Sequence, residues 1–207
     1  MGKWIAGTGL AILLVVGVGG CTVGSMVWGS YNNLTTLTEN VNSQWANVEN
    51  VYQRRADLVP NLVEAVRGYA IHESDTFIAV TEARAKVGQV NLKADQLTPQ
   101  MLTQFQAVQG ELSSALSRLM VVVEKYPDLK ANDLFRDLMT QVEGTENRIS
   151  VERNRYNEIA REYNTTRNKF PANLVANFFQ FNEKPYFKAE EGSKTAPKVD
   201  FKDLRQK

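Results

Sequence analysis

The sequence has little of what builds metal sites, disulfide frameworks or nucleic-acid surfaces. Its 207 residues include one cysteine and one histidine. These two cannot form an internal disulfide or supply the ligands of a structural zinc site. The charges nearly cancel, with 24 Lys and Arg against 23 Asp and Glu, whereas nucleic-acid-binding proteins usually carry a basic excess. We therefore expect no cofactor, no metal and no nucleic-acid partner.

Charge is also absent from one long stretch, because residues 4–38 contain no Asp, Glu, Lys or Arg. Residues 4–28 are mostly apolar, and a helix of this length spans about 37 Å, more than the roughly 30 Å hydrocarbon core of a bilayer. Trp4 and Trp28 stand at its two ends, where aromatic side chains anchor membrane helices. The pattern predicts a transmembrane anchor over residues 1–30.

Two other interpretations of this stretch stay open. The first is a cleaved secretory signal, although the apolar part of such a signal is usually only about 7–15 residues long. The second is a lipoprotein signal, because residues 18–21 read Val-Gly-Gly-Cys and resemble a lipobox. In that case Cys21 would become a lipidated N-terminus after cleavage.

The flanking charges and the glycines add two predictions. Lys3 precedes the apolar run, and the next basic residue is Arg54. The positive-inside rule therefore places the N-terminus in the cytoplasm and the rest of the chain outside it. Gly20 and Gly24 form a G-x-x-x-G pair that lets membrane helices approach closely. Membrane helices also tolerate glycine without pairing, but the pair leads us to expect self-association.

The rest of the chain predicts helices. Apolar residues recur at steps of three and four between Leu34 and Tyr69, which indicates an amphipathic helix that can continue directly from the anchor. Pro60 lies inside this pattern and should kink the helix or divide it near Asp57. Thr98 is a good helix cap because Pro99 follows it. Further helices are predicted over residues 75–87, 98–126, 132–170 and 172–181.

These elements predict an all-α fold, since no strand-like alternation of useful length is found. We expect the N-terminal transmembrane helix to be followed by an antiparallel bundle of three or four long helices over residues 31–188. Residues 189–207 are rich in charge and poor in apolar side chains, so they are expected to form a flexible tail.

The predicted bundle contains several distinctive segments, which are WANVEN at residues 45–50, YQRRADLVPNLV at 52–63, EGTENRI at 143–149 and FPANL at 170–174. Together these segments resemble the LemA family. The resemblance extends over residues 31–187. It implies a bacterial membrane protein with one transmembrane helix, an all-helical body and no established enzymatic activity. Some members are encoded near membrane proteases, which hints at such a partner. The Gly-Gly-Cys stretch ending at Cys21 is not part of the family pattern.

Charged residues lie inside the predicted helices. They could form a polar cleft, but we favour ion pairs between the first and last long helices that fix the helix register. The residues expected to take part are Glu49, Arg54, Arg55, Asp57, Glu143, Glu146 and Arg148. His72 stands beside Glu73 without a matching nucleophile or metal set, and it is expected to serve in a turn. We therefore predict no catalytic residues and no enzyme.

Aromatic residues are dense in the last ordered part of the sequence. They could pack over the open end of the bundle, or they could form a surface for a neighbouring subunit or the bilayer interface. The residues are Phe170, Phe178, Phe179, Phe181, Tyr186 and Phe187.

The functional prediction is a non-enzymatic, single-pass protein of the bacterial cytoplasmic membrane. Its body would act as a homo-oligomeric scaffold at the membrane surface. The alternative is a membrane-tethered adaptor that recruits an envelope protein such as a membrane protease. This adaptor would be held by the transmembrane helix or, as a lipoprotein, by a lipid.

Overall fold

The computed structural model describes residues 2–70, 73–90 and 92–188, and for residues 2–19, 21, 23 and 95 it describes the backbone alone. The described residues form helices and no strand, which confirms the all-α prediction. The tail predicted over residues 189–207 lies outside this part of the chain. The elements are α1 (Gly2–Arg67), α2 (Ser74–Gln89), the 3-10 helix η1 (Ala94–Gln96), α3 (Pro99–Val123), α4 (Pro127–Lys130), α5 (Asp133–Asn168) and α6 (Ala172–Phe178).

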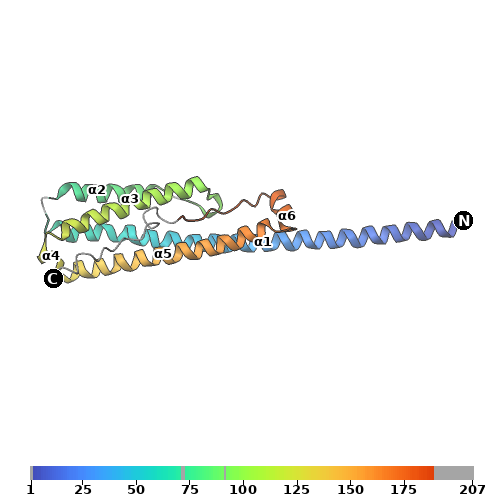
Figure 1. Cartoon of the computed structure of the whole chain (residues 1–207), viewed down its shortest axis with the longest axis horizontal. Helices are drawn as coiled ribbons and strands as arrows, with labels where there is room; N and C mark the ends of the chain where they lie inside the picture. Colours follow the sequence, from blue (N-terminus) through green and yellow to red (C-terminus); the bar gives the residue numbers. More distant parts are fainter. Residues whose placement is uncertain (1, 71–72, 91, 189–207) are drawn as a thin grey trace, which may run out of the picture.

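The long helices α1, α2, α3 and α5 lie side by side, and each runs in the direction opposite to the one before it (Figure 1). Helix α1 packs mainly against α5, and α2 packs mainly against α3. Helix α1 is much longer than the bundle. Its N-terminal part, residues 2–30, projects from one end of the bundle and is called the stem below (Figure 1).

Local sequence signals explain where α3 and α5 begin. The side chain of Thr98 accepts a hydrogen bond from the Met101 N–H at 3.2 Å, as expected for an N-cap followed by proline. The side chain of Asn132 accepts one from the Phe135 N–H at 3.1 Å. Both caps satisfy backbone donors that have no partner inside their own helix.

Pro60 does not divide α1, which excludes the break but not the kink, the other outcome predicted near Asp57. Proline lacks the N–H that would bond the carbonyl four residues earlier. That carbonyl belongs to Ala56, and it accepts a hydrogen bond at 3.5 Å from Nε of Arg84 on α2. Pro60 itself is exposed, while Val59 and Leu62 beside it are buried, so the apolar face of α1 continues past the proline.

The core has two parts along the bundle. The part far from the stem is mostly aliphatic and joins α1, α2, α3, α4 and the beginning of α5. The part near the stem joins α1, α3, α5, α6 and the segment after α6, and it contains most of the buried rings. The rings that meet there are Trp45, Tyr52, Phe105, Tyr156 and Phe187.

Within the described part of the chain, no helix is both long and apolar enough to cross a membrane. The side chains of Trp4 and Cys21, on which the anchor and lipidation predictions depend, lie outside the described residues. Gly20, Gly24 and Trp28 are exposed on the stem. Among the side chains of α1 that the structure describes, the first that is fully buried is Leu34.

Candidate functional site

Arg55 is a buried charge that joins three helices. Its side chain is 2% exposed, and Nη1 donates to Oε1 of Glu146 on α5 at 2.6 Å and to Oγ of Ser113 on α3 at 2.8 Å. Nη2 donates to the carbonyl oxygen of Gln109 at 3.2 Å and also to its side-chain Oε1. The planar guanidinium has several donors in fixed directions, so it can fix the register of α1 relative to α3 and α5.

The surroundings of Arg55 are structural rather than reactive. The guanidinium carbon lies 5.2 Å from the centre of the Tyr52 ring, a cation–π distance. Among the described residues, its Nε has no hydrogen-bond partner. The Ser113 hydroxyl accepts a hydrogen bond from Arg55. Among the described residues, no side chain that could act as a base is hydrogen-bonded to this hydroxyl. This arrangement can fix helices but offers no activated nucleophile.

Of the seven charged residues that the sequence analysis expected to form ion pairs between helices, only Arg55 and Glu146 contact each other in the described part of the chain. Arg54, Asp57, Glu143 and Arg148 are exposed and lie outside this network. Glu49 is half-buried, and burial raises the pKa of its carboxyl, an effect that a hydrogen bond with Trp45 partly offsets.

The segment after α6 is held by side chains that sequence reasoning missed. Residues 179–188 run back along α5 without helical structure. Asn164 bonds both backbone groups of Lys184, with its Nδ2 at 2.8 Å from the carbonyl oxygen and its Oδ1 at 2.9 Å from the N–H. Asn157 binds Phe187 in the same way, at 3.0 Å and 2.9 Å. We call this arrangement the asparagine clasp.

Further contacts extend the clasp in both directions. Nε of Arg167 donates to the Phe181 carbonyl at 2.7 Å, and the Tyr163 hydroxyl donates to the Asn182 carbonyl at 2.9 Å. Asn157 and Asn164 are seven residues apart, which places them on one face of α5 two turns apart. This spacing is the signal in the sequence that could have identified them.

The clasp carries Phe187 into the core, which for this residue favours packing over the bundle, one of the two alternatives left open by the sequence. The Phe187 ring is 5% exposed, stacks on Trp45 at 6.0 Å and meets Tyr156 edge-on at 5.3 Å. Phe181 is partly buried. By contrast, the remaining residues of the aromatic group are exposed; they are Phe170, Phe178, Phe179 and Tyr186.

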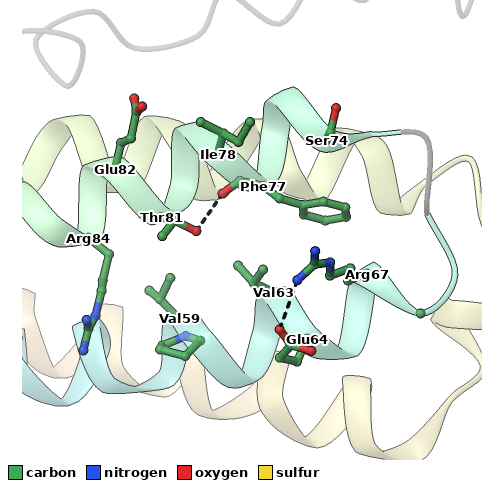
Figure 2. Close-up of a pocket in the computed structure, with 12 residues that line it drawn as sticks. Val59, Val63, Glu64, Arg67, Ser74, Phe77, Ile78, Thr81, Glu82 and Arg84 are labelled. Atoms are coloured by element: carbon green, nitrogen blue, oxygen red, sulfur yellow. Dashed lines mark hydrogen bonds and ion pairs between the residues drawn. The ribbon is translucent and has the colours of Figure 1, made fainter.

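An open groove of about 990 Å³ lies between α1 and α2 (Figure 2). Val59, Val63 and Phe77 supply apolar surface on its two sides. Arg84 reaches across from α2 toward α1 in the same view, where it bonds the Ala56 carbonyl. The groove can receive apolar side chains, and Pro60 contributes to its lining.

Charged residues stand along the same groove. Glu64 and Arg67 form an exposed pair on α1 at 3.7 Å, and Glu82 lies on α2 (Figure 2). The described residues contain no cluster of His, Cys, Asp and Glu that could hold a metal ion. His72 lies outside the described residues, so its predicted place in a turn is not covered by the structure. The groove therefore has the composition of a contact surface.

Comparison with known proteins identifies relatives that cover most of the chain. Two magnetosome proteins of Paramagnetospirillum magneticum, MamQ 1 and MamQ 2, are each 30% identical to the chain, covering 80% of it and 67% of their own length. A protein named LemA from Metamycoplasma hominis is 25% identical, covering 86% of the chain and 76% of its own length. The sequence pattern of the LemA family matches residues 44–201, which include Arg55, Glu146 and both asparagines of the clasp, and the chain therefore belongs to the LemA family.

Proposed function

We propose that this chain is a non-enzymatic, single-pass membrane protein that presents its helical bundle at the surface of the bacterial cytoplasmic membrane and assembles there with further copies of itself. The observation that carries the proposal is the continuity of α1. This one helix passes from the buried core around Trp45 and Leu34 into the exposed stem. A helix without a break transmits the position of one end to the other, as an anchor requires.

The amino-acid sequence of the stem supports a lipid environment for its N-terminal part. Residues 4–28 carry no charged side chain, and Trp28 ends the run at the side of the bundle. With Lys3 on the other side, the proposed topology has the N-terminus in the cytoplasm and the bundle outside it. Lipidation of Cys21 is the alternative mode of attachment.

The stem also has the features that self-association needs. A Cβ atom added at Gly20 or Gly24 would meet no described atom within 4 Å, so neither glycine is packed against the described part of the chain. Small residues four apart let two helix backbones approach closely in lipid, where packing drives association.

The test is extraction and sizing of the full chain. Membranes washed with alkaline carbonate should retain the protein, and native mass spectrometry in detergent should show more than one copy. Gly20→Leu with Gly24→Leu should lower the assembled fraction, while Thr22→Leu, between them on another side of the helix, should not. Release by carbonate would overturn the anchor, and a monomer at high concentration would overturn the assembly. The mass of the N-terminal peptide decides whether Cys21 is lipidated.

The groove between α1 and α2 favours a second candidate, the adaptor. An envelope protein with an exposed apolar segment could lie along Val63 and Phe77. A photo-crosslinking residue at Ile78, which lines the groove, should then capture one partner in living cells. The same residue at the exposed Val121, outside the groove, is the control. Equal capture from both positions, or capture of further copies of the chain alone, would contradict the adaptor.

A further inference from the structure

Helix α6 exposes large apolar side chains where a surface helix normally carries polar ones. Val175 and Ala176 face the core and are buried. Leu174 and Phe178 are one turn apart on the other face, where they are 60% and 80% exposed, and Phe170 in the turn just before α6 is 78% exposed. We call these three side chains the α6 face. The polar side chains of α6, Asn173 and Asn177, form a separate stripe beside this face, and a surface helix normally keeps large apolar side chains out of water.

The α6 face lies at the end of the bundle where the stem leaves it (Figure 1). The ring of Phe179, which follows α6, is 4.9 Å from that of Tyr31 on α1, and Phe181 is 5.6 Å from the same ring. Tyr31 is less than one turn from Trp28, the last residue of the apolar run. The contact therefore sets α6 beside the boundary that the proposed anchor would make with water.

The chemistry of this end of the bundle favours lipid over a charged protein surface. Residues 170–182, like residues 4–38, contain no Asp, Glu, Lys or Arg. Lys169 and Glu183 flank this segment. Lys169 is a long cation of the type that can extend to phosphate groups while its aliphatic part stays in apolar surroundings, and Glu183 lies 3.7 Å from Nη1 of Arg167. Carboxylates, which anionic lipid would repel, are absent from both segments that meet at Tyr31 and Phe179.

We infer that the α6 face is a second membrane contact, in which Phe170, Leu174 and Phe178 insert into the interfacial layer of the bilayer next to the stem. The occupant of this face is a lipid surface. The inference rests on the proposed anchor, which brings the face to the membrane. Contacts with the bilayer through both the stem and the α6 face would restrict the tilt of the bundle relative to the membrane. Attachment through the stem alone would restrict this tilt less.

The experiment places a reporter on the α6 face of the full chain in nanodiscs at one copy per disc. In a Cys21→Ser background, Phe178→Cys carries an environment-sensitive fluorophore, and Val121→Cys on α3, 65% exposed, carries it as the matched control. Nitroxide-bearing phospholipids should quench the probe at position 178 several-fold more than the probe at position 121. Equal and weak quenching in protein that is inserted in the discs overturns the inference and leaves the anchor intact.

Two further outcomes separate the remaining explanations. If the probe at position 178 is shielded only when two copies share a disc, a second copy of the chain covers the face and the inference is wrong. If the chain does not enter the discs, the proposed anchor fails and the inference fails with it. Photoactivatable phospholipid provides a check without labelling, because the unmodified chain should crosslink to lipid within residues 170–178 and not around residue 121.

Discussion

Asn164 on α5 bonds both backbone groups of Lys184, through its Nδ2 at 2.8 Å and its Oδ1 at 2.9 Å. A carboxamide offers one donor and one acceptor side by side, as a peptide group does. The Asn164 carboxamide therefore makes the hydrogen bonds to the backbone of this segment that a neighbouring β-strand would make in a sheet. Asn157 repeats the contact at Phe187, and the two together hold residues 179–188 against the bundle without any regular structure of their own.

Asn164→Leu should loosen this segment. Leucine has the same branching and number of heavy atoms but removes the two hydrogen bonds that Asn164 makes to the Lys184 backbone in a buried place, so the free energy of unfolding should fall by about 2 kcal/mol. Urea denaturation measures the fall, and amide hydrogen exchange at Lys184 should become faster. The control is Asn154→Leu, exposed on the same helix, which should change stability by less than about 0.5 kcal/mol. Equal effects at both positions would refute the clasp.

Phe187 and Phe178 provide a matched pair of phenylalanines. Phe187→Ala empties a site between Trp45 and Tyr156, and the free energy of unfolding should fall by about 3–5 kcal/mol. Phe178→Ala removes a ring that is 80% exposed, so stability measured in detergent should change by less than about 0.5 kcal/mol. Urea denaturation of both variants gives the comparison. A small loss for Phe187→Ala would show that the ring does not belong to the core.

The sequence predicted the helices because their evidence is local. Apolar spacing marked α1, α3 and α5, and the cap at Thr98 marked the start of α3. Of the kink or division expected at Pro60, the division is wrong because the carbonyl freed at Ala56 accepts a hydrogen bond from Arg84, on a helix that the sequence cannot place beside it. Tertiary contacts of this kind have no signal in the periodicity of one helix.

The site was predictable only in part for the same reason. Arg55 lies three residues after Tyr52 and four before Val59, both buried, so its place on the apolar face could be read from the spacing, while its neighbour Arg54 falls on the exposed face. Its partners on α3 could not be found in this way. Phe187 lies in a segment without periodicity, and only the clasp shows that it is buried.

Glu146→Gln should weaken the contact with Arg55. The change removes the carboxylate charge opposite a buried guanidinium, but Glu146 is 42% exposed, so water can replace part of the interaction. We expect the free energy of unfolding to fall by about 1–2 kcal/mol, less than the roughly 3–5 kcal/mol seen when a fully buried pair is broken. Glu143→Gln, exposed on the same helix, is the control and should have little effect in urea denaturation. A loss shared by both variants would point to a general charge effect.

Tyr156 should make the fold sensitive to alkaline pH. Its hydroxyl is buried without a hydrogen-bond partner among the described residues, and burial raises the pKa of the phenol above its ordinary value of 10.0. Above that value the unfolded chain loses this proton while the folded chain keeps it, so stability falls as pH rises. Tyr156→Phe should leave stability at neutral pH unchanged or raise it by about 1 kcal/mol, and should make the alkaline decline less steep. Urea denaturation at neutral pH and near pH 11 measures both, and a variant less stable than the natural chain at neutral pH would mean that the hydroxyl has a partner.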